Sequence, residues 1–191
     1  MVGTGQLAAH LIESHALVRP IREVRIWGRR PERARALALA LARGRPSGAT
    51  PWSVQCADDL EASVRWANIV SCATLAREPL VKGAWLAPGQ HLDLVGAFTP
   101  EMREADDEAM ARAEIYVDTR EGVLKESGEI LGAIARGVIR ESAIRAELGE
   151  LASGRFRRSE PQAITVFKSV GTALEDLAAA ELALARPAGP H

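Results

Sequence analysis

The stretch that decides the fold is 3-GTGQLAAHLIE-13, close to the first residue of the chain. Gly3, Gly5 and Ala8 fit the spacing G-x-G-x-x-G/A. In this motif the first glycine permits a tight turn, the second lets a pyrophosphate approach the backbone, and a small third residue lets helix and strand pack closely. Apolar residues then recur at helical spacing. The pattern predicts a dinucleotide-binding turn that opens a helix; the alternative is a glycine turn that only packs a helix.

The rest of the chain alternates strand and helix signals. Strands are expected in EVRIWG (23–28), WSVQCA (52–57), NIVSCAT (68–74), HLDLVGA (91–97), EIYVDT (114–119) and AITVFK (163–168). Helices are expected at 29–44, at 58–67 with Asp58 or Asp59 as the cap, at 99–113 and over most of 120–152, with a loop at 45–51. Such alternation predicts an α/β fold, a Rossmann-like, doubly wound, mostly parallel sheet. We expect a dinucleotide-binding domain over 1–168, a long C-terminal helix over 169–186 and a tail at 187–191.

Length and composition exclude several classes of protein. A chain of 191 residues suits one domain. The net charge of −1 and pI near 6.4 create no field that would attract nucleic acid or an anionic membrane. No apolar run approaches the roughly 20 residues of a transmembrane helix. Cys56 and Cys72 lie on separate predicted elements and no signal peptide is recognisable, which favours reduced thiols and a cytoplasmic protein.

The end of the second predicted strand bears on which nucleotide binds. An Asp or Glu there bonds the ribose 2′-hydroxyl of NAD, whereas arginine accommodates the 2′-phosphate of NADP. Here Arg29 and Arg30 follow the strand, with no carboxylate before Glu32. Positive charge at a helix start opposes the helix dipole unless an anion binds there. The pattern favours NADP(H) over NAD(H); the alternative is two arginines that only solvate the helix start.

Other polar residues carry less information. His10, His15 and His91 show no metal-ligand spacing with cysteine or carboxylate, so no metal site is expected. The segments EADDEAM (104–110) and KESGE (125–129) pair carboxylates, but acidic residues early in helices commonly act as caps or lie on solvated faces. We interpret both segments in that way, and the sequence identifies no catalytic residue.

A set of segments spanning nearly the whole chain resembles, in order and spacing, the ornithine cyclodeaminase and mu-crystallin family. The segments are GTGQLAAH (3–10), VRIWGRRPERA (24–34), SCATLAREPLV (71–81), WLAPGQHLDLVGAFTPEMREAD (85–106), VDTREGVLKESGEI (117–130), AELGEL (146–151) and TVFKSVGTALEDLAAA (165–180). The resemblance implies a nicotinamide nucleotide on the Rossmann domain. It also implies a small imino or amino acid as substrate, bound between this domain and an N-terminal domain that forms the homodimer.

The resemblance also implies a set of cofactor-binding residues. The pyrophosphate would be lined by Gly3, Gly5, Gln6 and Leu7, the 2′-phosphate by Arg29 and Arg30, the adenosine side by Thr74 and Leu75, and the nicotinamide end by Val95 and Ser169. Three of these positions have an alternative role. Thr74 could be a strand-end hydrogen-bonding residue, Val95 a core residue, and Ser169 a cap of the C-terminal helix.

One departure from the family pattern bears on the reaction. Cyclodeaminases of the family carry an Asp in a GGDCPGK-like stretch, where this chain has VGAFTPEMRE with Phe98 and Met102 at the matching places. A phenyl ring cannot exchange a proton. The departure favours the branch that resembles ketimine reductases such as Δ1-pyrroline-2-carboxylate reductase, with alanine dehydrogenase or ornithine cyclodeaminase activity of a longer parent as the alternatives.

The start of the chain raises a last expectation. The resemblance implies that the substrate domain and most of the first strand normally precede the glycine turn, while only Met1 and Val2 do so here. We expect the two strands beside this short first strand to have unpaired backbone groups. The chain is then a fragment that lacks half of an active site and is inactive alone, or a non-catalytic remnant that binds nucleotide or a partner.

Overall fold

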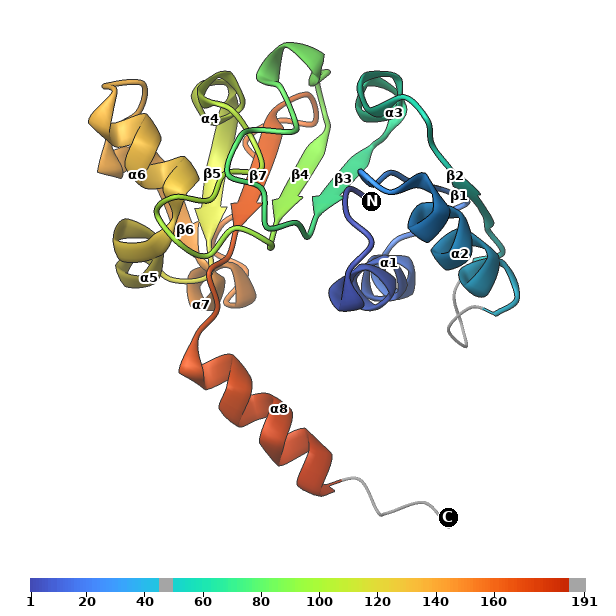
Figure 1. Ribbon diagram of the computed structural model, residues 1–191. Helices are drawn as coiled ribbons and strands as arrows, with labels where there is room; N and C mark the ends of the chain where they lie inside the picture. The colour runs from blue at the N-terminus through green and yellow to red at the C-terminus, as the bar shows by residue number, and fades with distance from the viewer. Residues whose placement is uncertain (45–49, 186–191) are drawn as a thin grey trace.

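The computed structural model describes residues 1–44 and 50–185, and these form the α/β fold that the sequence predicts (Figure 1). The strands are β1 (Glu23–Ile26), β2 (Ser53–Cys56), β3 (Ile69–Cys72), β4 (His91–Leu94), β5 (Ala113–Val117), β6 (Ile144–Glu147) and β7 (Ile164–Lys168). The helices are α1 (Gln6–Val18), α2 (Pro31–Ala42), α3 (Leu60–Trp66), α4 (Asp107–Arg112), α5 (Arg120–Glu126), α6 (Gly128–Ala135), α7 (Leu148–Ala152) and α8 (Ala173–Ala185), with 3-10 turns at Gly83–Trp85 and Glu141–Ala143. Most of the loop expected at 45–51, and all of the tail at 187–191, lies outside the described residues.

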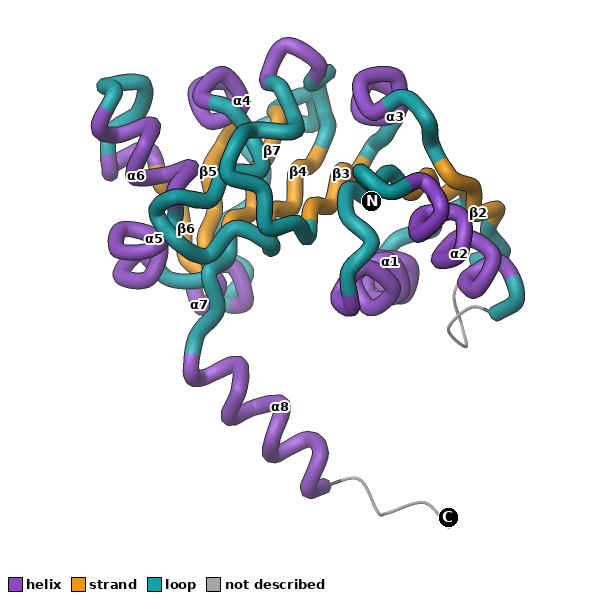
Figure 2. The backbone as a smooth tube through the Cα atoms, viewed as in Figure 1, coloured by secondary structure: helices purple, strands orange, loops and turns teal. Residues whose placement is uncertain are grey.

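The sheet consists of two parallel blocks joined at one point. One block consists of strands β3, β4, β7, β5 and β6 in that order (Figure 2), and β1 pairs with β2 in the other (Figure 1). Val2 bridges both blocks, since it pairs with Trp27 after β1 and with Cys72 in β3. The first segment of the chain therefore lies in the middle of the sheet, and the two halves wind away from it in opposite directions. This is the doubly wound arrangement that was expected.

Local sequence explains most helix boundaries. Asp59 caps α3 by accepting a hydrogen bond from Ala62 N–H at 3.0 Å, and Pro31 occupies the first turn of α2, where its missing N–H costs nothing. Cys56 and Cys72 are free cysteines in this structure. Burial raises the pKa of the Cys72 thiol well above its usual range, so this side chain stays protonated.

Three segments differ from the helix predictions. Strand β6 lies within the stretch expected to be helical, because its buried residues Ile144 and Ala146 pair with β5 across the sheet. The helix expected at 99–113 occupies only α4, since Glu104 is drawn into the core before the helix begins. Helix α8 starts later than 169, because Ser169 N–H continues the sheet by donating to Leu94 C=O at 3.1 Å.

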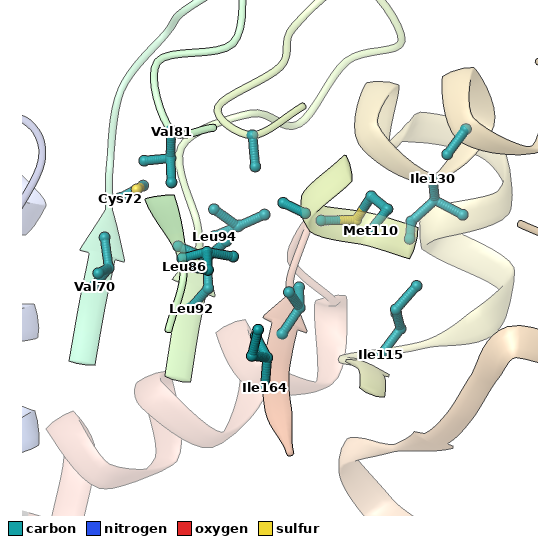
Figure 3. Close-up of a cluster of buried hydrophobic side chains, with 14 of the residues drawn as sticks. Val70, Cys72, Val81, Leu86, Leu92, Leu94, Met110, Ile115, Ile130 and Ile164 are labelled. Carbon is teal, nitrogen blue, oxygen red and sulfur yellow. The ribbon is translucent and has the colours of Figure 1, made fainter. Parts of the chain in front are cut away.

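The two blocks have separate hydrophobic cores. The larger core lies between the five-stranded block and the helices on it, and contains Val70, Leu92, Leu94, Met110 and Ile130 (Figure 3). The smaller core lies between β1 and the helices α1 and α2, with Ile12, Val24, Ile26, Ala34, Ala38 and Leu41. Each block therefore buries its own apolar face.

Helix α8 extends away from both blocks (Figure 1). All of its described residues are exposed, including Leu174, Leu177, Leu182 and Leu184. Helix α8 therefore carries exposed apolar side chains along its described length. Among the described residues, no helix combines the length and apolar character needed to cross a membrane.

Candidate nucleotide-binding site

The candidate site lies at the carboxyl ends of the parallel strands. We call this side of the sheet the carboxyl edge, or simply the edge. After residues 1–3 the chain first forms β1 on one side of them and later forms β3 on the other side. The direction in which strands are added therefore switches at the glycine turn. Parallel α/β sheets bind ligands in the crevice at such a switch point, outside the carboxyl ends of the strands.

Gly3 is required by the fold itself. Its φ of +117° lies in the left-handed region, and a Cβ placed there would lie 2.5 Å from the carbonyl oxygen of Ala73. Its N–H donates to Trp27 C=O at 2.9 Å. The first glycine of the motif thus lets the turn pass between the ends of β1 and β3.

Gly5 differs from Gly3, because its surroundings leave room for a side chain. A Cβ at Gly5 would meet no atom within 4 Å, and its φ of −78° is open to any residue. Gly5 is the N-cap of α1, forms no side-chain capping bond, and is followed by a first turn without an acidic residue. Gln6 and Leu7 are exposed there, whereas Ala8 is fully buried. Gly5, Gln6 and Leu7 are thus exposed at the N-terminal end of α1, and an exposed helix N-terminus is the geometry that binds phosphate.

Arg29 and Arg30 lie beside the glycine turn. Gly28 packs so closely on it that a Cβ would lie 2.8 Å from Thr4 Cγ2. Both arginines that follow are exposed, and Arg30 is the N-cap residue of α2. The structure therefore brings two guanidinium groups to the start of α2, on the β1 side of the turn.

The remaining predicted residues follow on the other side of the turn. Thr74 and Leu75 lie two and three residues after the end of β3, Val95 directly after β4 and Ser169 directly after β7. These three strands are neighbours in the sheet. A Cβ at Gly96 would lie 2.1 Å from Thr74 N, so the ends of β3 and β4 touch. All ten predicted residues thus occupy one edge, with Thr74 and Leu75 on the flank of the glycine turn opposite to the arginines.

Three buried ionisable residues that sequence reasoning missed support this edge. Glu104 Oε1 accepts hydrogen bonds from Thr74 N at 2.6 Å and Thr74 Oγ1 at 2.8 Å, and its Oε2 accepts one from Gly96 N at 2.8 Å. Glu129 Oε1 accepts the N–H of Glu104 at 2.7 Å, and Glu129 Oε2 lies 3.7 Å from Lys168 Nζ. All three side chains are fully buried. We call Glu104, Glu129 and Lys168 the buried triad.

The buried triad has electrostatic consequences. Burial raises the pKa of the Glu104 carboxyl above its usual range, against the hydrogen bonds from Thr74 and Gly96 that lower it. Lys168 also donates to the carbonyl groups of Leu94 and Ala97. The triad therefore fastens the loops after β3 and β4 to each other and to β7.

Asp118 supports the adjoining loop after β7. Its side chain is 2% exposed, and its Oδ2 accepts the N–H groups of Val170 and Gly171, both at 2.7 Å. These two residues follow Ser169. Asp118 therefore sets the position of the loop at the expected nicotinamide end.

The interpretation of the two acidic segments was wrong for Glu104 and Glu129. These carboxylates are buried within the protein and neither caps a helix by a side-chain bond nor lies on a solvated face. Asp106 fits the interpretation, because it caps α4 by accepting a hydrogen bond from Ala109 N–H at 3.0 Å. No local signal separates these residues, since burial depends on the packing of segments distant in the sequence. Within residues 1–44 and 50–185, no three His, Cys, Asp or Glu side chains form a group that could hold a metal ion.

The fold is of the Rossmann type, a class that commonly binds dinucleotides at this end of the sheet. The model of the ornithine cyclodeaminase/mu-crystallin family matches residues 1–186, and the chain belongs to this family.

Known relatives include enzymes that act on imino and amino acids. The chain is 42% identical to a Δ1-pyrroline-2-carboxylate reductase of Paracoccus denitrificans over 179 residues, which cover 93% of this chain and 55% of the relative. Among solved structures it is similar to the Δ1-pyrroline-2-carboxylate reductase of Thermococcus litoralis in complex with NADH and L-proline, with a TM-score of 0.87 and 34% identity over 95% of this chain and 55% of the other. It is also similar to an archaeal alanine dehydrogenase dimer with bound NAD, with a TM-score of 0.83 and 31% identity over 95% and 54% of the two chains.

Two facts follow from these similarities. The predicted family is confirmed, and similar solved structures include oxidoreductases that hold NADH or NAD. The chain spans about half the length of the relatives that it matches.

Proposed function

We propose that this chain is the NADP(H)-binding domain of an imino-acid reductase. The observation that carries the proposal is the open N-terminus of α1 at the switch point of the sheet, with Gly5 unobstructed and two exposed arginines beside it. A helix N-terminus of this kind favours a pyrophosphate, and guanidinium groups bind a phosphate through charge-assisted hydrogen bonds.

Each predicted residue has a role in the proposed complex. In this proposal the pyrophosphate lies on Gly3, Gly5, Gln6 and Leu7. The 2′-phosphate lies on Arg29 and Arg30, the adenosine side on Thr74 and Leu75, and the nicotinamide end at Val95 and Ser169. The nicotinamide supplies hydride chemistry when bound. The buried triad and Asp118 keep the loops that hold it in place.

The proposed reaction is reduction of the C=N bond of a small cyclic imino acid. The names of two relatives support this substrate class. Phe98, 47% exposed just after β4, has no proton to exchange and thus disfavours cyclodeamination. Alanine dehydrogenation is the second candidate, because a structurally similar relative carries out that reaction with NAD.

The proposal extends to the surroundings of the domain. We infer a cytoplasmic protein with reduced thiols, in keeping with two free cysteines. We also infer that the substrate carboxylate and the homodimer contact require a further domain, towards which α8 extends, and that these 191 residues alone reduce imino acids little or not at all.

Nucleotide titration with thermal-shift detection tests the proposal. We expect a saturable rise in Tm with NADPH and a weaker response to NADH. Arg29→Asp should weaken NADPH binding by roughly tenfold to a hundredfold, since a hydrogen bond to a charged group is worth about 1.5–3 kcal/mol, and should change NADH binding little.

Arg33→Asp is the matched control, because Arg33 is an exposed arginine one turn further along α2. Equal losses of NADPH and NADH affinity in Arg29→Asp would refute the preference for NADP(H). A wild-type chain that binds neither nucleotide would refute the proposed function.

A further inference from the structure

Three buried carboxylates lie beneath the loops at the expected nicotinamide end of the carboxyl edge. Glu104 and Glu129 belong to the buried triad and are fully buried, and Asp118, which directly follows β5, is 2% exposed. Their neighbours Ala105 and Ile130 are also fully buried and belong to the large core. Charges in such surroundings are screened much less than charges in water.

The hydrogen bonds of these carboxylates suit the ionised form. Both oxygens of Glu104 accept from backbone N–H groups, those of Thr74 and Gly96, which cannot accept a hydrogen bond in return. Asp118 likewise accepts backbone N–H groups on both of its oxygens, at 2.7 Å. Bonds from such donors favour the charged form of a carboxyl group. In Glu104 they act against burial, which raises the pKa of this group.

Lys168 is the one buried cation beside these three charges in the described part of the chain. Its Nζ lies 3.7 Å from Glu129 Oε2, and Glu129 also lies in the first turn of α6, where the helix dipole favours a negative charge. Glu129 is thus the compensated member of the set. Within residues 1–44 and 50–185, neither Glu104 nor Asp118 forms an ion pair. The group as a whole carries an excess of negative charge.

The two carboxylates without an ion pair flank the expected nicotinamide contacts. Glu104 accepts the N–H of the residue after Val95, at 2.8 Å. Asp118 accepts the N–H of the residue after Ser169, at 2.7 Å. Strand β7 has β4 on one side and β5 on the other, so the two carboxylates approach its end from both sides. A ring bound at Val95 and Ser169 would therefore lie close to both negative charges.

The oxidised and the reduced forms of a nicotinamide nucleotide differ in charge at this ring. The oxidised ring carries one positive charge and the reduced ring carries none, whereas the phosphates and the adenosine are the same in both forms. A negatively charged site attracts a cation and has no such attraction for a neutral ring. The difference in affinity between the two forms therefore reports the charge at the nicotinamide end, because contacts elsewhere on the nucleotide cancel.

We propose that Glu104 and Asp118 bias the nicotinamide end electrostatically, so that the domain binds the oxidised, cationic nucleotide more tightly than the reduced one. This inference rests on the proposed function and gives the two residues a role beyond the positioning of loops. In the proposed reduction, tighter binding of the oxidised form makes the bound reduced form a stronger hydride donor. A tenfold difference in affinity lowers the potential of the bound two-electron couple by about 30 mV.

Calorimetric titrations of the 191-residue chain with NADP⁺ and with NADPH test the proposal through the ratio of the two Kd values. We expect the wild type to bind NADP⁺ more tightly. Glu104→Gln and Asp118→Asn each remove one charge at nearly constant shape. Each should reduce the preference for NADP⁺ by roughly threefold to tenfold, the order of magnitude for a unit charge acting through protein over about 10 Å. NAD⁺ and NADH should show the same change, because they carry the same rings.

Two further variants separate charge from structure. Thr74→Val removes the hydroxyl that donates to Glu104 and changes no charge, so it should leave the ratio as it is even if both nucleotides bind more weakly. Glu121→Gln removes an exposed carboxylate in the first turn of α5, where water and salt screen the charge, and should also leave the ratio unchanged.

The possible outcomes distinguish this inference from the proposed function. A wild type that binds NADPH more tightly than NADP⁺ would overturn the inference. Binding of both nucleotides with the same ratio in the wild type, Glu104→Gln and Asp118→Asn would do so as well. A chain that binds no nucleotide refutes the proposed function and the inference with it. If one of the two variants does not fold, the other decides, because each removes one of the two charges.

Discussion

The two blocks of the sheet differ in how completely each is built. In the described residues, the five-stranded block has a continuous core of twenty buried residues and the buried triad beneath its loops, while the β1–β2 block has a core of six. Residues 1–3 join the blocks at one bridged position. The five-stranded block should therefore unfold as the more stable unit, and the β1–β2 block should open first.

This difference matters for nucleotide binding, because the proposed site extends over both blocks. The arginines belong to the weaker block, and Val95 and Ser169 to the stronger one. A nucleotide that contacts both would stabilise their junction by mass action. Four changes would break or sharpen the comparison.

Loss of the buried charge pair should have the largest effect. Lys168→Met leaves the Glu129 carboxylate buried without its cation, and removal of one partner of a buried pair typically costs about 3–5 kcal/mol. Urea unfolding would measure this loss. The control is Lys125→Met, in the exposed Lys125–Glu121 pair, for which a loss below about 0.5 kcal/mol is expected. Similar small losses in both variants would show that the triad does not hold the five-stranded block together.

Core truncation should separate the two blocks. Leu92→Ala and Ile26→Ala each remove a fully buried side chain, from the large and the small core respectively. Leu92→Ala should lower the global free energy of unfolding by about 2–5 kcal/mol. Ile26→Ala should accelerate amide exchange in β1 and β2 and leave exchange in β4 and β7 unchanged. Faster exchange throughout the sheet in Ile26→Ala would mean that the chain unfolds as one unit.

Acid should destabilise the five-stranded block through His91 in β4. Burial lowers the pKa of this imidazole from 6.5 to about 4, and Thr165 Oγ1 lies 2.8 Å from its Nδ1. The unfolded chain takes up this proton at a higher pH than the folded protein does. The neutral imidazole therefore makes its full contribution to the free energy of unfolding above pH 6.5. This contribution, on the order of 3 kcal/mol, is lost as the pH falls to about 4.

Urea unfolding of the wild type and of His91→Gln across this range measures the contribution of His91. Both proteins contain the same carboxyl groups, so the difference between the two curves reports the imidazole of His91. Two curves that stay parallel from pH 7 to pH 4 would exclude the effect.

The two glycines of the motif should differ at the junction of the blocks. Gly3→Ala forces a left-handed residue against Ala73 and should cost about 1–3 kcal/mol. Gly5→Ala meets no atom, and the lower entropy of the unfolded chain offsets the weaker N-cap that alanine makes, so stability should change by less than about 1 kcal/mol, while NADPH binding weakens. Thermal melts with and without NADPH separate the two effects. Unchanged NADPH affinity in Gly5→Ala would place the pyrophosphate elsewhere.

Much of the fold was predictable because its signals are local. Six strands are short, mostly apolar segments between turn residues, namely β1, β2, β3, β4, β5 and β7. Helix α1 starts at a glycine turn that is recognisable from the spacing of its residues. Strand β6 was not predictable, because Arg145 and Glu147 give it no strand preference and only its pairing with β5 makes it a strand.

The candidate site divides in the same way. By itself, the sequence determined the glycine turn, the two arginines and the family, since these depend on residue type and spacing along the chain. Tertiary structure alone decided that Gly3 is needed by the fold while Gly5 is free for a ligand, and that Glu104, Glu129 and Lys168 are buried together. The physical reason is that burial and strand pairing arise between residues far apart in the chain, where no local pattern records them.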